Sequence, residues 1–436
     1  MPERNLTTVM ESRMPAETVR VLRDLGRVAD ERGAAALVVG GVVRDLLLGV
    51  PTGDLDIVVT EPAVDFGRAA AGALGGEVKA VTRFGTALLA LPGGVKVDLA
   101  TARSEVYERP GALPTVSGGT MDDDLLRRDF TLNSLAVAIN EGDFGRLIDR
   151  FGGLADLERG VLRVLTGRSF EDDPTRTLRA VRLSARYGFR LEDGTRRLLE
   201  RAVRDGCLAT VTGERLLNEI VLILREPAPW PAAERLSAWG ILAGIDEAWT
   251  GAPSEPVFAE LARMLHPESG PALAPDAEPW VAFFAALLDA APRERRGRVL
   301  DRLAAPRRLR DAARQADELD GFSGGRLGAA DEMRRSEVRR LLDGFGPDAL
   351  VLGVARRPGS VAAARIRLFV EDIRHVRAEL SGSDVIAMGV APGPAVGRVL
   401  SAVLDAKLDG LARGRAGEES LAREVARNLD TGNKAC

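Results

Sequence analysis

The period of the hydrophobic residues changes once along the chain, near Ser169. Before that point, short β-branched runs at 35–41 and 54–60 alternate with segments of helical period. After it, segments such as 174–189 repeat apolar residues at helical spacing, and strand-like runs are no longer found. Strands that alternate with helices pack as a sheet covered by helices, whereas helices without strands pack on one another. The sequence therefore predicts an α/β N-terminal region followed by an all-α C-terminal half.

Glycines and turn residues mark the ends of the expected elements. We expect helices at 16–32, 43–48, near 63–73 and throughout 122–139, and strands at 35–41, at 54–60 and on both sides of a turn within 86–102. The first 14 residues carry both charge signs and lack the apolar run of a secretory signal. We expect them to be a flexible start of the chain.

Length and composition restrict the class of protein. A chain of 436 residues is too long for one hydrophobic core, and its length suggests about three units. No uncharged apolar stretch is long enough to span a bilayer, so we expect no membrane insertion. Cys207 and Cys436 are too few for a disulfide framework, which fits a reducing, cytoplasmic location. No feature indicates an obligate protein partner.

The net charge of −4 does not favour nucleic acid as a partner, but the local distribution of charge differs from the total. Residues 293–315 contain nine arginines against three acids. Such a stretch fits a phosphate-binding surface or an ordinary pair of solvated helices, and composition alone leaves both open.

Three acidic residues interrupt apolar strands. Asp54 and Asp56 share one face of their strand because alternate side chains point the same way. Asp98 interrupts a second β-branched run after the Gly93-Gly94 turn. By itself the first pair also fits a surface loop, but three carboxylates on two neighbouring strands favour a site for hard cations such as Mg²⁺. Two such cations serve displacement at phosphorus, so the pattern indicates nucleotidyl transfer or phosphodiester cleavage.

Paired glycines lie between the first strand and the following helix. Gly40 and Gly41 leave the backbone N–H groups of this turn open to a phosphate, and Arg44 lies one helical turn further on. Asp45 is expected to pair only locally. The spacing matches neither a Walker loop nor a dinucleotide-binding fingerprint.

A second group of candidate residues begins the all-α half. Asp173 and Pro174 form a helix start, and Arg176, Arg179 and Arg182 follow at intervals of three. These arginines fit an exposed helix or a binding face. An aspartate beside an arginine offers an acceptor and a forked donor, which match the edge of cytosine or adenine.

Several of these motifs resemble one enzyme family. The runs "GGVVRDLLLGVPTGDLD", "RRDFTLN" and "DDPTRTLRAVRLSARYGF" resemble those of the bacterial and eukaryotic class of CCA-adding tRNA nucleotidyltransferases, which share them with bacterial poly(A) polymerases. The resemblance covers 35–225, and residues 381–410 resemble the C-terminal tRNA-binding helices of the family. Seen alone, "RRDFTLN" also fits a surface ion pair beside core residues.

The resemblance implies both a fold and a division of the chain. It implies a nucleotidyltransferase head with a polymerase-β-like sheet and helices, followed by helices only. The implied parts are an N-terminal helix at 1–32, the catalytic head at 33–155, a nucleotide-selecting neck at 156–225, a body at 226–375 and a tRNA-binding tail at 376–436.

The resemblance also implies roles for single residues. Asp54, Asp56 and Asp98 match the metal-binding carboxylates, with Mg²⁺ as the expected cofactor. Gly41 and Arg44 match nucleotide contacts, and we add Gly40 from the turn itself. The remaining nucleotide-binding positions implied are Arg128, Asp129, Asn133, Asp173, Arg176, Arg179 and Arg182, with Asp173 and Arg176 as the pair that reads the base.

The expected function is template-independent addition of CCA to tRNA from CTP and ATP, with release of pyrophosphate by a two-metal mechanism. The segment after Asp98 is short compared with the flexible loop of family members that switch from CTP to ATP, which leaves addition of CC only as an option. The alternatives are a poly(A) polymerase or A-adding enzyme, and a catalytically silent RNA-binding protein.

Overall fold

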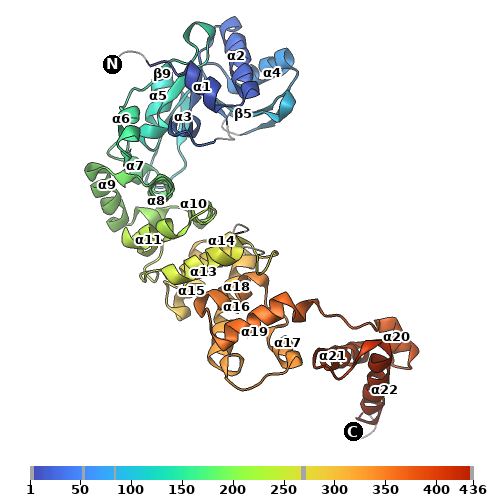
Figure 1. Cartoon of the computed structure of the whole chain (residues 1–436). Helices are drawn as coiled ribbons and strands as arrows, with labels where there is room; N and C mark the ends of the chain where they lie inside the picture. Colours follow the sequence, from blue (N-terminus) through green and yellow to red (C-terminus); the bar gives the residue numbers. More distant parts are fainter. Residues whose placement is uncertain (1–3, 52–54, 83–84, 267–271, 433–436) are drawn as a thin grey trace. The chain divides into compact units, whose positions relative to one another are not determined.

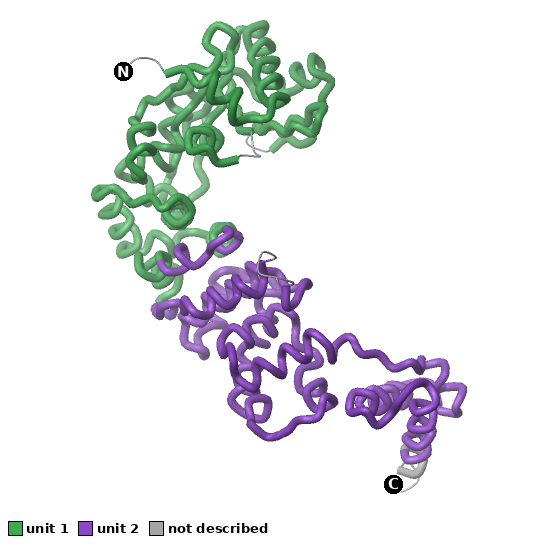
Figure 2. Tube along the Cα trace, viewed as in Figure 1, with its two compact units in different colours: residues 1–223, 235–247 green, residues 224–234, 248–436 purple. Residues whose placement is uncertain are grey.

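The computed structural model describes residues 4–51, 55–82, 85–266 and 272–432. The chain divides into two compact units (Figure 2). Unit 1 comprises residues 1–223 and 235–247, and unit 2 comprises residues 224–234 and 248–436. Unit 1 contains every strand and unit 2 is helical over its described residues, so the predicted α/β region followed by helices is confirmed. The finer division into five parts stays a prediction.

Unit 1 is built around a mixed sheet of seven strands (Figure 1). The strand order is β3-β4-β5-β2-β1-β8-β9. β2 and β5 run parallel, and the other neighbouring pairs are antiparallel. The bounds are β1 Ala36–Val39, β2 Asp56–Val59, β3 Glu77–Val81, β4 Ala87–Ala90, β5 Lys96–Thr101, β8 Ala136–Ala138 and β9 Leu147–Ile148.

The two faces of this sheet are covered unequally. One face carries Ile57 and Leu99 and packs in a large apolar cluster with α1 Thr7–Arg13, α2 Ala16–Glu31, α3 Gly41–Leu48 and α4 Ala63–Leu74. Val58 belongs to a much smaller cluster on the opposite face. Because side chains alternate along a strand, Asp56 and Asp98 lie on this less covered face. Two charged side chains in the central strands are therefore compatible with a buried apolar core on the other face.

Three predicted helices and one predicted pair of strands in the head are confirmed. Helix α2 ends just before Gly33, α3 ends at Gly49 with a left-handed conformation, and α4 closely matches the expected helix near 63–73. β4 and β5 pair across the short 3-10 helix η1 Pro92–Gly94, as the Gly93-Gly94 turn predicted.

The predicted helix over 122–139 is wrong. Only α5 Met121–Leu126 forms there, capped by the Thr120 side chain. The chain then turns through the 3-10 helix η2 Thr131–Asn133 into β8, which pairs with both β1 and β9. All three residues of β8 are buried, so no alternation of polar and apolar residues distinguishes the strand from a buried helix.

The expected flexible start is also wrong for the described residues. Asn5 forms a bridge with Arg146, and Leu6 and Met10 are fully buried under α1. The burial of these two apolar side chains packs the segment on the core, although the segment carries both charge signs.

A helical region completes unit 1 and shares the core of the head through Phe170 and Leu183. The prediction that no strand follows Ser169 is wrong, because the short strand β11 lies after this residue and pairs in parallel with β10. The remaining elements of the chain before residue 248, of which α11 is divided between the two units, are the hairpin β6 Arg103–Val106 and β7 Thr115–Gly118, η3 Glu141–Asp143, α6 Gly153–Glu158, β10 Val161–Leu162, α7 Ser169–Asp172, α8 Thr175–Tyr187, β11 Arg190–Leu191, α9 Asp193–Arg204, η4 Cys207–Thr210, α10 Gly213–Leu224, α11 Trp230–Ala238 and α12 Ile241–Ile245.

Unit 2 is a helical assembly whose central helix, α14, is apolar almost all round. Its elements are α13 Glu255–Leu265, α14 Pro279–Leu288, η6 Arg293–Arg295, α15 Arg296–Arg302, α16 Arg307–Gly324, η7 Arg326–Gly328, α17 Arg335–Leu342, α18 Pro347–Arg356, α19 Val361–Glu371, η8 Ile373–His375, α20 Gly382–Ala387, α21 Pro394–Leu408 and α22 Gly414–Gly432. The last three helices share a small apolar core that includes Val385 and Val399.

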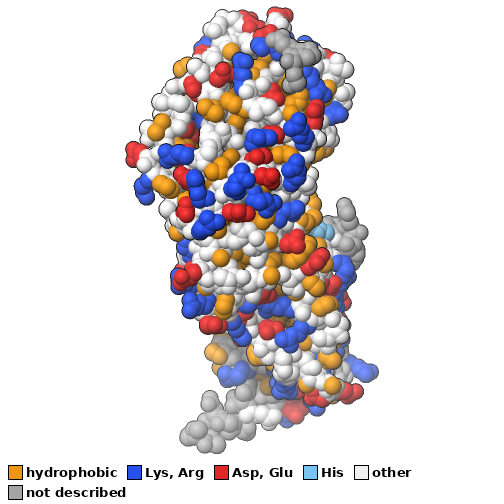
Figure 3. Space-filling model, turned by 90° about the vertical axis from the view of Figure 1, so that its left-hand side faces the viewer, with side chains coloured by type: hydrophobic (Ala, Val, Ile, Leu, Met, Phe, Trp, Pro, Cys, Tyr) orange, Lys and Arg blue, Asp and Glu red, His pale blue; other side chains and the backbone are white. Residues whose placement is uncertain are grey.

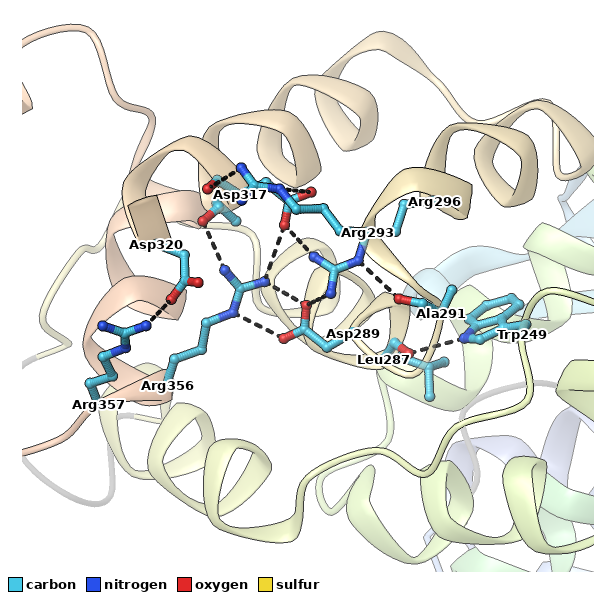
Figure 4. Close-up of polar contacts among 11 residues, drawn as sticks. Trp249, Leu287, Asp289, Ala291, Arg293, Arg296, Asp317, Asp320, Arg356 and Arg357 are labelled. Atoms are coloured by element: carbon cyan, nitrogen blue, oxygen red, sulfur yellow. Dashed lines mark hydrogen bonds and ion pairs between the residues drawn. The ribbon is translucent and has the colours of Figure 1, made fainter. Parts of the chain in front are cut away.

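Arginines of the 293–315 segment pair with acids of neighbouring helices (Figure 4). Arg296 contacts Asp289 at 3.0 Å and also pairs with Asp317. Arg356 donates from Nε to Asp289 at 2.9 Å. Figure 3 likewise shows basic and acidic side chains interspersed over the face it displays. These pairs favour the structural interpretation of the arginine-rich segment.

Among the described residues, no helix is both long enough and apolar enough to cross a membrane.

Candidate active site

One polar pocket of about 290 Å³ in unit 1 brings together most of the predicted site residues. We call it the polar pocket. The predicted residues that line it are Gly40, Gly41, Asp56, Arg128, Asp129, Asn133, Asp173, Arg176 and Arg179. They come from β2, from the start of α3 and the residue before it, from the segment after α5, and from α8 and the short link before it. A larger cavity of about 870 Å³ near Leu46 and Lys96 is lined by none of the predicted residues.

Asp56 and Asp98 are direct neighbours in the parallel pair of β2 and β5. Their side chains leave the sheet on the same face because paired residues of adjacent strands point the same way. Asp54 lies outside the described residues. Within the described part of the chain, no three histidine, cysteine or acidic side chains group as a metal site. The two described carboxylates nevertheless provide the all-oxygen ligands that suit Mg²⁺.

The turn before α3 requires glycine at its first position. Gly40 has a φ of 77°, and a Cβ there would lie 2.8 Å from Nη1 of Arg128. The Arg128 guanidinium therefore lies directly against bare backbone. Its Nη2 donates to Asp124 at 2.9 Å, whereas its buried Nε has no partner among the described residues. Arg128 thus lines the polar pocket with one buried donor that has no acceptor among the described residues.

Arg44 is buried beside the polar pocket but does not line it. Its Nη1 donates to Asn133 at 2.6 Å, and its Nε donates to Asp45 at 2.9 Å. Tyr187 completes the group by accepting from Arg44 and donating to Asp45. Asp45 pairs locally, as expected, and the network orients Asn133, which does line the polar pocket.

Asp129 is an ionised carboxylate in the protein interior. Burial alone would raise its pKa, but the charge of Arg179 and a hydrogen bond from Asn133 outweigh burial and lower the pKa to about 2. Arg179 donates from Nε to Asp129 at 2.7 Å, and the pKa of Arg179 is raised chiefly by that carboxylate. The pair links the residues after α5 to helix α8.

Asp173 and Arg176 lie in the same pocket with their orientations fixed. Oδ1 of Asp173 accepts from Thr175 and, at 2.8 Å, from Arg215, while Oδ2 has no hydrogen-bond partner among the described residues. The guanidinium of Arg176 is 8% exposed and donates to Ser169 and to the backbone oxygen of Arg127. One carboxylate oxygen and one anchored guanidinium thus line the polar pocket side by side.

Arg182 does not line the polar pocket. Three residues fall short of a full helical turn, so successive arginines at this spacing rotate by about 60° around the helix. Arg182 consequently pairs with Glu219 of α10 at 3.5 Å. Burial raises the pKa of that glutamate.

Three lining residues were missed by sequence reasoning as contributors to the site, namely Glu105, Tyr107 and Arg127. Glu105 accepts from Tyr107 and from Arg127, both at 3.0 Å. Burial, followed by the charge of Glu105, raises the pKa of Tyr107 to about 12. The sequence did contain a signal for these residues. Arg103, Glu105 and Tyr107 occupy every second position along β6 and just after it, so their side chains share one face of this extended segment.

The arrangement combines two recognition features in one cavity. Gly40 and Arg128 offer backbone and a cationic donor to an anion beside the acidic face of β2 and β5. Asp173 and Arg176 offer an acceptor and donors to a planar polar group. A ligand with phosphates and an aromatic base fits both features.

Comparison with known proteins gives consistent matches. Residues 36–163 match the family model described as the Poly A polymerase head domain. The chain is 35% identical over 376 residues to the CC-adding tRNA nucleotidyltransferase of Deinococcus radiodurans, covering 86% of this chain and 84% of that protein. It is 37% identical over 396 residues to the A-adding tRNA nucleotidyltransferase of Geobacter sulfurreducens, covering 90% of this chain but only 45% of that protein.

Other A-adding relatives are also longer than the matched region. The chain covers 58% of the A-adding enzyme of Halalkalibacterium halodurans, so it spans about half the length of such proteins or less. Among solved structures, the Thermotoga maritima CCA-adding enzyme complexed with tRNA_CCA superimposes with a TM-score of 0.78 at 31% identity, covering 98% of this chain and 100% of that one. The chain therefore belongs to the family of tRNA nucleotidyltransferases that includes the CCA-adding, CC-adding and A-adding enzymes.

Proposed function

We propose that this protein is a tRNA nucleotidyltransferase that adds nucleotides of the CCA end to tRNA from CTP and ATP and releases pyrophosphate. The observation that carries the proposal is the convergence of Asp56, the Gly40 turn and the Asp173–Arg176 pair on one pocket. The carboxylates adjoin the place where a phosphate would lie, and the pair adjoins the place where a base would lie. The similarity to CC-adding and A-adding relatives supports this reading.

The nucleotide phosphates bind at the glycine turn. The backbone of Gly40 and Gly41 approaches the phosphates without a side chain in between, and Arg128 supplies a positive charge at the same wall of the pocket. Arg179 adds positive charge while staying paired with Asp129. Arg44 and Arg182 do not line the polar pocket. Arg44 instead holds the pocket residue Asn133, and Arg182 pairs with Glu219.

Selection of the base follows from the direction of hydrogen bonding. Oδ2 of Asp173 accepts from the exocyclic amine of cytosine or adenine, and Arg176 donates to the adjacent ring nitrogen. Uracil and guanine present a carbonyl and a ring N–H at the equivalent positions, so both hydrogen bonds would be lost with them. The side-chain pair therefore acts in place of a template base.

The acidic face of β2 and β5 holds the divalent cation. Asp56 and Asp98, with Asp54 from the same segment of chain, are the residues that would bind Mg²⁺. When bound, Mg²⁺ neutralises phosphate charge and lowers the pKa of the attacking hydroxyl. The protein orients the nucleotide so that the 3′ oxygen of tRNA forms a bond to the α-phosphorus while the bond to pyrophosphate breaks.

The C-terminal helices are proposed to hold the tRNA. The segment 381–410 comprises α20 and α21, and Gly393 lies just before the α21 N-terminus. Structured RNA is bound mainly through its shape and its phosphates, and a helix N-terminus can contribute to such contacts. We place the reaction in the cytoplasm, where tRNA maturation takes place.

The test is incorporation of labelled nucleotides into tRNAs that end before CCA, after C and after CC, with unstructured RNA as a control. We expect CTP to extend the first two substrates and ATP to extend the third. Incorporation of CTP alone would identify a CC-adding enzyme, and ATP alone on the third substrate would identify an A-adding enzyme. Extension of unstructured RNA by ATP would identify a poly(A) polymerase. Absence of incorporation with every substrate would leave only RNA binding and overturn the proposal.

A further inference from the structure

Asp124 is a buried acid that both tandem arginines of the polar pocket contact. It lies in α5 with 1% of its surface exposed. Its Oδ1 accepts from Nε and Nη2 of Arg127 at 2.9 and 2.7 Å, and its Oδ2 accepts from Nη2 of Arg128 at 2.9 Å. We propose that Asp124 is a positioning residue for the incoming nucleotide, which it serves through these two arginines. The inference rests on the proposed function.

The contact with Asp124 fixes the orientation of the Arg128 guanidinium, which belongs to a residue that lines the polar pocket. A guanidinium is planar and rigid, so a carboxylate on one nitrogen sets the direction of the other two. With Nη2 held by Asp124, Nη1 lies against Gly40 and Nε stays without a protein partner among the described residues. Without the carboxylate, the long side chain of Arg128 would sample other rotamers and lose this preorganisation.

The contact with Arg127 extends the effect to helix α8. The Arg127 side chain lies between Asp124 and Glu105, with Nη1 donating to Glu105 at 3.0 Å. Its backbone oxygen accepts from Nη2 of Arg176 at 2.6 Å. Asp124 thus supports Arg128, proposed to bind phosphate, and Arg176, proposed to read the base, although these residues lie on different elements.

Only a carboxylate satisfies this geometry. Each oxygen of Asp124 accepts from a different cation, which requires two acceptor atoms and a negative charge. Asparagine has the same shape but only one acceptor oxygen, and its amide would direct hydrogens at one of the two guanidiniums. Asp124→Asn therefore removes the function of the residue with almost no change in volume.

The experiment measures steady-state kinetics of nucleotide incorporation by the full chain carrying Asp124→Asn. We expect KM for CTP or ATP to rise about 10-fold or more, because the nucleotide must then order the Arg128 side chain itself. At saturating nucleotide, kcat stays within about 3-fold of the wild-type value, because the bound nucleotide restores the position of Arg128. Asp122→Asn is the matched control, since the ion-pair partner of this exposed acid among the described residues is Arg150, at 3.0 Å, which lies outside the polar pocket.

Two further measurements keep the test decisive. Arg128→Gln leaves Asp124 and its bonds to Arg127 in place and should raise KM by a similar factor, even if Asp124→Asn fails to fold. Equilibrium binding of labelled ATP should weaken in both variants, and this readout remains if the wild-type protein incorporates no nucleotide. A fall in kcat with unchanged KM in Asp124→Asn, or unchanged ATP binding in a folded variant, would reduce Asp124 to a structural residue and overturn the inference.

Discussion

Asp129 illustrates how single residues of the polar pocket keep their charge away from water. Its side chain accepts hydrogen bonds from Asn133 and Arg179, and its exposed fraction is 5%. A buried carboxylate without partners would instead take up a proton. The pocket therefore depends on pairs in which each charge stabilises the other, and removal of one partner affects both.

The lowered pKa of Asp129 predicts a pH dependence of stability. Because the folded-state pKa is about 2 and the unfolded value is 3.8, the stabilising contribution is complete above the unfolded pKa and is lost as the pH falls through the folded pKa. The loss amounts to about 2 kcal/mol between pH 5 and 2. We expect urea unfolding followed by circular dichroism to show this extra slope in the wild type and not in Asp129→Asn. Parallel pH profiles for the two proteins would contradict the assignment.

At the scale of elements, α8 carries arginines with different tasks. Arg176 and Arg179 line the polar pocket, whereas Arg182 lies against Glu219 of α10. The rotation of about 60° at each three-residue step accounts for this division. A run of evenly spaced arginines is therefore not one uniform binding face.

The division along α8 predicts opposite behaviour for two substitutions. Arg176→Ala should raise KM for CTP and ATP roughly 10- to 100-fold, because it removes donors to the base. Arg182→Ala should leave KM within about 3-fold and lower the free energy of unfolding by about 1–3 kcal/mol, since it leaves a buried glutamate unpaired. Kinetics and urea unfolding of both variants check this. A large rise in KM in Arg182→Ala with unchanged stability would instead indicate that Arg182 contacts the nucleotide.

The same elements show what the sequence could and could not predict. Helices α2 and α3 were predictable because apolar residues repeat at helical spacing and glycines follow. β8 was not, because a buried strand between two others shows no alternation. Most lining residues inside motifs were predictable, but Arg127 was missed although it lies in one, and Glu105 and Tyr107 were missed because they lie outside the motifs, in β6 and just after it. Arg44 lies in a motif, yet its contacts are internal.

At the scale of the whole molecule, the balance of charge is local. The chain has 60 basic and 64 acidic residues, and in unit 2 ion pairs such as Arg356–Asp289 account for arginines that composition could assign to RNA. Unit 1 contains every residue that lines the polar pocket, so the proposed binding and selection of the nucleotide depend on one compact body. Unit 2 is left to provide the proposed contacts with tRNA.

The measurement that tests the central claim most directly is nucleotide incorporation into tRNA lacking CCA by Asp56→Asn. Asp56 lines the polar pocket and is paired with Asp98 on the neighbouring strand, although Asp98 is not among the lining residues. If these carboxylates hold the divalent cation, kcat should fall at least about 100-fold. Removal of a metal ligand should lower activity at least as much as removal of a residue that only hydrogen-bonds to such a ligand. Asp65→Asn, on the exposed face of α4, should incorporate at the wild-type rate. Undiminished incorporation by Asp56→Asn would contradict the account.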